Sequence, residues 1–270
     1  MRFVSYQHEG SRYVGVHEGS EVVPLIGISE ISPDTPAEAL TRAERDVTAA
    51  VPFESVQLLP AVPNPTKVIC VGVNYEKHKI ESKRTDVDYP VLFAKYAASL
   101  LGARDEIVRP RAEFVDYEAE LAIVIGKRGR WIAEADAWDH VLGSTLANDI
   151  TARDYQYKTH QWLQGKAWDR STPVGPEIVT VDEFMPVSGS IRCIVNGSVE
   201  QDADLSDLIF SIPVLIATIS EFTELLPGDL ILTGTPGGVG YRREPQLNLQ
   251  TGDEVTVEIE GIGTMTNTLR

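Results

Sequence analysis

The sequence has few cysteines and few basic residues, and these shortages narrow the classes of protein it can belong to. Of its 270 residues only Cys70 and Cys193 are cysteines. Both lie in apolar, strand-like stretches, which favours two buried, reduced thiols in a cytoplasmic protein. Lys and Arg number 24 against 40 Asp and Glu, giving a formal net charge of −16. Because such a surface repels phosphate backbones and anionic lipid, we expect neither nucleic acid nor a membrane as a partner.

Long apolar runs are also missing. No segment approaches the roughly 18 uninterrupted apolar residues of a membrane-spanning helix. The most apolar stretch, residues 208–219, is broken by Ser211, Pro213 and Thr218, so we expect it in the core. The N-terminal residues MRFVSYQHEG lack the apolar run of a signal peptide. With 43% hydrophobic and 24% charged residues, the chain has the composition of an ordinary globular protein.

Turn residues divide the chain into two unequal parts. Residues 1–25 alternate as short strands, a helical pattern covers residues 36–51, and a proline-rich linker follows. We therefore predict a small N-terminal α+β domain over residues 1–64 and a larger domain over residues 65–270. Many short strands and few helices in the larger part predict a β-rich α+β fold. Asn196-Gly197 is the strongest hairpin signal in the sequence.

The segment from Asp116 to Glu120 is the first that points to chemistry. On one strand Asp116, Glu118 and Glu120 would share a face, because side chains two apart point the same way. Adjacent carboxylates repel, and a hard divalent cation such as Mg²⁺ removes that cost. Asp149, at the end of an apolar strand, is a candidate third ligand. The alternatives are a solvated edge strand for the first three and a helix N-cap for Asp149.

Other polar residues suggest acid–base and binding roles. His78 and Glu81 are three apart, so on one helical turn the carboxylate could orient the imidazole as a general base. The alternative is a solvated histidine in a charged helix. Lys166 is either a substrate-facing cation or a surface lysine. The loop Thr233–Gly240 matches neither phosphate-binding glycine motif, which leaves a plain turn or a close backbone approach to a small ligand.

Together these segments resemble the fumarylacetoacetate hydrolase family over residues 65–268. The order and number of the matching segments make the resemblance specific; they are VGVNYEKHKIE, PVLFAKY, DYEAELAIVIGK, NDITARDYQ, QGKAWD, LLPGDLILTGTPGGVG and LQTGDEVTVEIEGIG. The resemblance implies a mixed β-sandwich roll, a homodimer, and a bound Mg²⁺ or Mn²⁺. Residues 1–64 are similar to the small, variable N-terminal domain of many members.

The resemblance also implies roles for individual residues. The family's metal ligands match Glu118, Glu120 and Asp149, with Asp116 at most supporting them. Its catalytic dyad matches His78 and Glu81, and its substrate-contacting lysine matches Lys166. The remaining matches are expected to bind substrate, and they are Arg153, Gln156 and Thr235. Residues 82–89 match the lid region, which differs among subfamilies and indicates no substrate.

The family acts on 2-oxo acids with a second carbonyl or enol nearby. We expect C–C hydrolysis of an acylpyruvate such as fumarylpyruvate or acetylpyruvate, releasing pyruvate. His78 with Glu81 would activate water, while the metal and Lys166 would stabilise the enolate that forms. The same site could serve an oxaloacetate decarboxylase, or a 2-hydroxydienoate isomerase or hydratase, or enol–keto isomerisation. A non-catalytic scaffold would be expected to have lost His78, Glu81 or Lys166, and all three are present.

Overall fold

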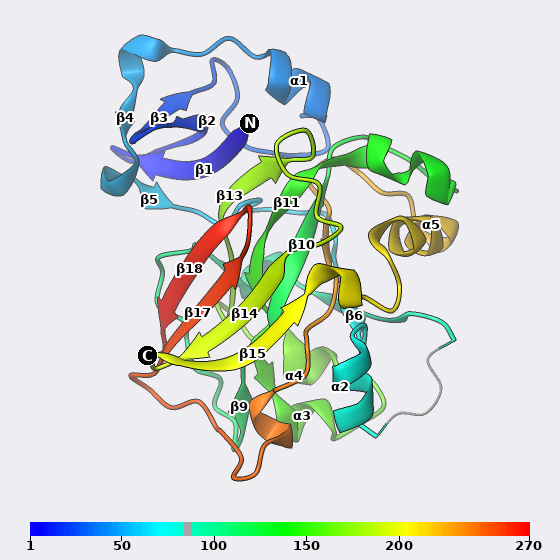
Figure 1. The fold of residues 1–270 in the computed structure, drawn as a ribbon. Helices are drawn as coiled ribbons and strands as arrows, with labels where there is room; N and C mark the ends of the chain where they lie inside the picture. Colours follow the sequence, from blue (N-terminus) through cyan, green and yellow to red (C-terminus); the bar gives the residue numbers. More distant parts are fainter. Residues whose placement is uncertain (84–87) are drawn as a thin grey trace.

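The computed structural model describes residues 1–83 and 88–270, which fold into one large sheet and two small ones (Figure 1). The large sheet has the order β4-β3-β2-β1-β13-β11-β10-β16-β6-β7, with β5 beside β1 and β8 beside β13. The pairs β16–β6 and β13–β8 are parallel, whereas the central pairs β10–β11 and β11–β13 are antiparallel. The predicted β-rich fold with a mixed sheet is confirmed.

The strands are short throughout. The strands of the large sheet are β1 (Arg2–His8), β2 (Ser11–Glu18), β3 (Glu21–Pro24), β4 (Val51–Pro52), β5 (Gln57–Leu58), β6 (Val68–Gly72), β7 (Val91–Lys95), β8 (Leu100–Leu101), β10 (Ala119–Ile125), β11 (Val141–Asn148), β13 (Thr172–Thr180) and β16 (Leu230–Leu232). The small sheets contain β9 (Val115–Asp116) with β12 (Thr151–Ala152), and β14 (Ser190–Val195), β15 (Ser198–Asp204), β17 (Glu254–Ile259) and β18 (Gly263–Thr268).

The helices are few, as the sequence predicted. The α-helices are α1 (Ala37–Arg42), α2 (Glu76–Glu81), α3 (Arg153–Gln156), α4 (Leu163–Lys166) and α5 (Ile212–Phe222). The 3₁₀ helices are η1 (Val47–Ala49), η2 (Phe53–Ser55), η3 (Ala97–Ser99), η4 (Glu134–His140), η5 (Leu205–Asp207) and η6 (Gly240–Arg242). In the part of the chain that the structure describes, no helix has the length and apolar character needed to cross a bilayer.

The N-terminal strands continue the sheet of the larger part. β1 pairs with β13, with Phe3 opposite Ile178, so residues 1–64 share a sheet with later residues. Their standing as a separate domain stays a prediction. The prediction of a helix over residues 36–51 is wrong beyond Arg42, because α1 ends there. Leu40 is the buried residue of α1, and a helix with so little apolar surface to pack is not stabilised over more turns.

Two hairpins form the four-stranded sheet in front of β10 and β11 (Figure 1). Asn196 and Gly197 both have positive φ, +50° and +82°, at the turn between β14 and β15. A two-residue turn with this geometry matches the right-handed twist of the strands, which is why the sequence signal predicted it correctly. β17 and β18 form the closing hairpin.

Strand β10 runs through the centre of the molecule and carries the start of the site. Leu121, Ile123 and Ile125 pack into one apolar cluster, whereas Ala122 and Val124 pack into another on the opposite face. Burial on both faces fixes the register of the strand, because a one-residue slip would exchange the two sets. The polar residues at its start are therefore held in place by the core, close to helices α2, α3 and α4 (Figure 1).

Candidate active site

Three carboxylates meet where β10 begins and β11 ends. The antiparallel register places Ala119 opposite Asn148, which brings Glu118 and Glu120 beside Asp149. Oxygen atoms of the three side chains all lie within 4.8 Å of one another, and all three residues are buried. The solvated edge strand is therefore wrong for Glu118 and Glu120. Asp149 is not the N-cap of α3, a position that Ala152 occupies.

Three cationic side chains surround these carboxylates. Lys166 Nζ lies 2.7 Å from Glu118 Oε2 and 2.7 Å from Asp149 Oδ2. Arg153 Nη1 lies 2.7 Å from Glu118 Oε1. Lys95 Nζ pairs with Asp149 Oδ1, and both side chains are fully buried. Sequence reasoning missed Lys95; the signal that could have found it is a lysine ending the apolar strand VLFAK, which is β7.

The three carboxylates differ in electrostatic environment. Burial alone would raise the pKa of Glu118, but Lys166 and Arg153 outweigh it and lower that pKa to about 2. Burial, together with repulsion from Asp149 and Glu118, raises the pKa of Glu120 well above its usual range. Burial opposes the charge on Lys166, yet the neighbouring carboxylates prevail and raise its pKa. Glu120 is thus the carboxylate whose charge is least compensated; its Oε2 accepts a hydrogen bond from Gly234 N at 2.8 Å.

This donor set fits a hard divalent cation. It consists of carboxylate oxygens only, which Mg²⁺ and Mn²⁺ prefer over softer ligands. With Asp116 included, four carboxylates face the three cations Lys95, Arg153 and Lys166. A further positive charge would therefore relieve the repulsion felt by Glu120. The residues that would hold such an ion are Glu118, Glu120 and Asp149.

Asp116, Glu118 and Glu120 do not lie on the single strand expected for them, because that strand is divided. Asp116 ends β9, and β10 starts only at Ala119. Its Oδ2 accepts from Arg153 Nε at 2.8 Å, and its Oδ1 accepts from Gly240 N at 2.7 Å. Asp116 therefore supports the site by fixing a guanidinium and a loop, in agreement with the supporting role expected for it.

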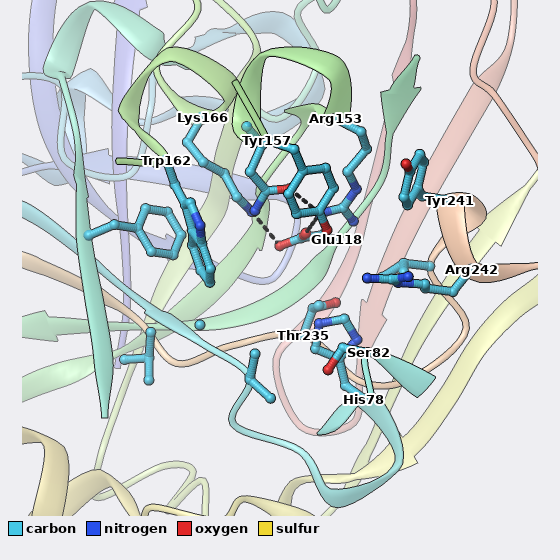
Figure 2. A pocket seen from close by; sticks show the side chains of 16 residues that line it. His78, Ser82, Glu118, Arg153, Tyr157, Trp162, Lys166, Thr235, Tyr241 and Arg242 are labelled. Carbon is cyan, nitrogen blue, oxygen red and sulfur yellow. Dashed lines mark hydrogen bonds and ion pairs between the residues drawn. The ribbon is translucent and has the colours of Figure 1, made fainter. Parts of the chain in front are cut away.

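The predicted dyad is formed on helix α2. His78 Nδ1 lies 2.7 Å from Glu81 Oε1, and Glu81 Oε2 accepts from Gly238 N at 2.9 Å. His78 is buried and lines the pocket, so the solvated-histidine alternative is wrong. Because Nδ1 is engaged by Glu81, Nε2 is the ring nitrogen available to the pocket. Figure 2 shows His78 and Thr235 across the pocket from Lys166 and Arg153.

The glycine-rich loop after β16 directs its backbone N–H groups at site carboxylates. Gly234 donates to Glu120 and Gly238 donates to Glu81. A side chain at Gly238 would meet Glu200 O at 2.3 Å, and its φ of +105° also favours glycine. The close backbone approach expected of this loop is therefore made to the protein's own acids.

One pocket collects most of the predicted site residues (Figure 2). Those that line it are His78, Glu118, Arg153, Gln156, Lys166 and Thr235. The other predicted residues are not among the lining residues: Glu81 contacts His78, Asp149 contacts Lys166, and Glu120 accepts from Gly234 N. Arg153 Nη1 donates to Gln156 Oε1 at 3.0 Å, whereas the buried Nη2 has no hydrogen-bond partner among the described residues. Of the predicted lid, residues 84–87 lie outside the described residues.

Comparison with known proteins identifies relatives along the whole chain. A human protein named as a mitochondrial oxaloacetate tautomerase is 39% identical over 99% of this chain and 91% of its own length. A Xenopus laevis protein of the same description is 45% identical over 79% of this chain and 68% of its own length. Their names place these relatives in mitochondria, so the cytoplasmic location of this chain stays a prediction.

Solved structures of similar proteins share the fold. A fumarylacetoacetate hydrolase from Exiguobacterium antarcticum has a TM-score of 0.88 and 34% identity, covering 100% of this chain and 99% of its own. A 5-carboxymethyl-2-hydroxymuconate delta-isomerase from Mycobacterium smegmatis has a TM-score of 0.84 and 32% identity, and the match covers 100% of this chain and 99% of the isomerase. The family model "fumarylacetoacetate (FAA) hydrolase C-terminal" matches residues 67–270. The chain therefore belongs to the fumarylacetoacetate hydrolase family, as its sequence motifs had suggested.

Proposed function

We propose that this protein is a metal-dependent enzyme that interconverts the enol and keto forms of a 2-oxo dicarboxylic acid such as oxaloacetate. The observation that carries the proposal is the placement of the buried carboxylates Glu118, Glu120 and Asp149 beside a pocket with cationic walls. The relatives named as oxaloacetate tautomerases support this reaction over the C–C hydrolysis that the motifs alone favoured.

The polar side chains Arg153, Gln156 and Lys166 of the pocket each have a place in binding. A divalent cation held by the three carboxylates would supply positive charge to the 2-oxo oxygen and the neighbouring carboxylate. Arg153 offers its unpartnered Nη2 to that same substrate carboxylate, with Gln156 holding the guanidinium in orientation. Lys166 keeps a charged ammonium beside Glu118, where it stabilises negative charge developing on the substrate oxygen.

His78 performs the proton transfer. In the keto form the proton to be moved is on C3, and His78 Nε2 takes it while Glu81 holds the imidazole through Nδ1. The substrate oxygen at C2 gains a proton from solvent, which completes the enol. In the reverse direction His78 gives a proton to C3 while the enol oxygen at C2 loses its proton to solvent. No bond between carbon atoms is made or broken.

The test is the rate at which enol-oxaloacetate disappears when it is mixed with purified protein and Mg²⁺. We expect the native protein to cause rapid loss of the enol absorbance. The His78→Ala variant should accelerate this loss very little, and chelation of the metal by EDTA should abolish the enzymatic rate. A native protein that leaves the enol decaying at its rate in buffer alone would overturn the proposal, and so would full activity in EDTA.

Hydrolysis of an acylpyruvate is the second candidate, because the His78–Glu81 pair is also suited to activating water. The experiment compares acetylpyruvate, fumarylpyruvate, oxaloacetate and a 2-hydroxydienoate with Mg²⁺ present. Release of pyruvate from an acylpyruvate, lost in His78→Ala, would favour hydrolysis; oxaloacetate decarboxylation would persist in that variant because it needs no activated water. The preferred metal and the homodimer stay predictions.

A further inference from the structure

The pocket carries a cation that none of the roles above uses. Three cationic side chains line it, Arg153, Lys166 and Arg242, against one carboxylate, Glu118. Two of these cations are ion-paired: Lys166 with Glu118 and Asp149, and Arg153 with Asp116 and Glu118. For Arg242, no ion pair or side-chain hydrogen bond is found within residues 1–83 and 88–270. In a chain with 40 acidic residues, an arginine without a carboxylate partner at a pocket wall is available to an anionic ligand.

Arg242 is mounted on a firmly held turn. It ends η6, where Gly240 N and Tyr241 N both donate to the buried Asp116, at 2.7 and 3.0 Å. A side chain at Gly240 would meet Leu247 O at 2.0 Å, so only glycine allows this close approach. The Tyr241 ring packs edge-on against Phe114, with ring centroids 5.1 Å apart. The exposed Arg242 side chain therefore extends from a fixed base, and Figure 2 shows it directed toward the pocket.

Asp116 links the two arginines of the pocket. The same carboxylate that holds the η6 turn also accepts from Arg153 Nε at 2.8 Å. Arg153 is buried next to Glu118, whereas Arg242 is exposed at the pocket wall. Arg153 thus lies beside a candidate metal ligand, whereas Arg242 lies at the exposed wall of the same pocket.

We propose that Arg242 binds the second carboxylate of the substrate, the one remote from the 2-oxo group, and so selects dicarboxylic over monocarboxylic 2-oxo acids. This inference rests on the proposed function for the position of the first carboxylate. The planar guanidinium forms a bidentate pair with a carboxylate. Since Arg242 is exposed, the gain is modest, about fivefold in affinity, and it falls as salt screens the pair.

The test compares two ligand pairs, in each of which one member lacks the distant negative charge. Enol–keto interconversion is measured for oxaloacetate and its C4 methyl ester, and binding with Mg²⁺ is measured by calorimetry for malate and 2-hydroxybutanoate. We expect Arg242→Met to lower kcat/KM for oxaloacetate and the affinity for malate about fivefold, leaving the values for the ester and for 2-hydroxybutanoate unchanged. Arg242→Lys should retain part of the preference.

The matched control is Arg128→Met, which removes an exposed arginine that pairs with Glu224 away from the pocket. Arg128→Met should change neither the preference for oxaloacetate over its ester nor the preference for malate over 2-hydroxybutanoate. Equal losses for both members of each ligand pair in Arg242→Met would overturn the inference, as would a native protein that binds malate no better than 2-hydroxybutanoate. If malate binding depends on Arg242 while no substrate is interconverted, the proposed function fails and the carboxylate subsite stands. If Arg242→Met interconverts oxaloacetate with an unchanged preference over the ester, the carboxylate subsite fails and the proposed function stands.

Discussion

Lys166 Nζ bridges Glu118 and Asp149, at 2.7 Å from an oxygen of each, although Glu118 immediately precedes β10 and Asp149 immediately follows β11. The lysine therefore connects the start of β10 to the end of β11 through two ion pairs. Both carboxylates are candidate ligands of one divalent ion. The bridge explains how these two acids can be buried together in a folded chain.

Replacing Lys166 with Met should destabilise the metal-free protein by about 3–5 kcal/mol, because two buried carboxylates lose a shared partner. Mg²⁺ should restore much of this loss, since a divalent cation can take over the compensation of charge. Thermal unfolding with and without Mg²⁺ measures both effects.

Lys67→Met is the matched control, because Lys67 pairs with the buried Asp229 outside the candidate site. It should lower stability, and Mg²⁺ should raise its melting temperature only as much as it raises that of the native protein, so that the deficit remains. An unchanged melting temperature for metal-free Lys166→Met, or equal recovery of the two variants in Mg²⁺, would contradict this account.

Metal binding should depend on pH through Glu120. Burial and the neighbouring carboxylates raise the pKa of Glu120 in the folded, metal-free protein, so this carboxyl group tends to hold a proton there. Between the unfolded pKa and the raised folded pKa the folded state binds more protons, so this group's contribution to stability falls as pH rises. A metal ion needs the ionised form, so binding releases a proton and affinity increases with pH.

Calorimetry of Mg²⁺ binding in buffers with different ionisation enthalpies measures the released proton. Glu120→Gln is the comparison variant, and it should bind Mg²⁺ weakly. Without metal, its stability should not show the decline with rising pH that Glu120 causes in the native protein. Affinity for Mg²⁺ that is the same across the pH range in which the metal-free protein takes up protons would speak against the role of Glu120.

The buried Gln201 should act through Thr235. Gln201 Oε1 accepts from Ala119 N at 2.9 Å, and its Nε2 donates to Thr235 Oγ1 at 2.7 Å, which leaves the threonine proton free for a ligand. Gln201→Leu should cost about 1–3 kcal/mol in stability through unpaired buried groups. It should also raise KM for the 2-oxo acid, with kcat changed little, because Thr235 loses its fixed orientation.

Thr235→Val tests the pathway of this effect. The two single variants should raise KM by similar factors, and the double variant should raise it no further, because both remove the same contact. Independent, multiplying effects of the two substitutions on KM would show that Gln201 does not work through Thr235.

Local features of the fold could be predicted from the sequence because local physics determines them. Asn196-Gly197 predicted its hairpin through backbone conformation alone. Pro213 stands near the start of α5, where its missing N–H costs little. Helix α1 ended early because its length depends on packing, which the periodicity of the sequence does not contain.

The candidate site was predictable where motifs carry it and not where only tertiary packing creates it. The motifs indicated Glu118, Glu120 and Asp149, and the structure brings them together. Lys95 has no motif of its own, and its pairing with Asp149 spans 54 residues of sequence. Gln201 likewise enters the site only because the hairpin of β14 and β15 packs near β10.

The most direct test of the central claim is a crystal structure of the protein grown with Mn²⁺, with anomalous scattering measured at the manganese edge. The account predicts one manganese ion bound by oxygen atoms of Glu118, Glu120 and Asp149, next to the pocket lined by Lys166. Carboxylates that point away from one another with no anomalous peak between them would contradict it, and so would a manganese ion bound only elsewhere on the chain.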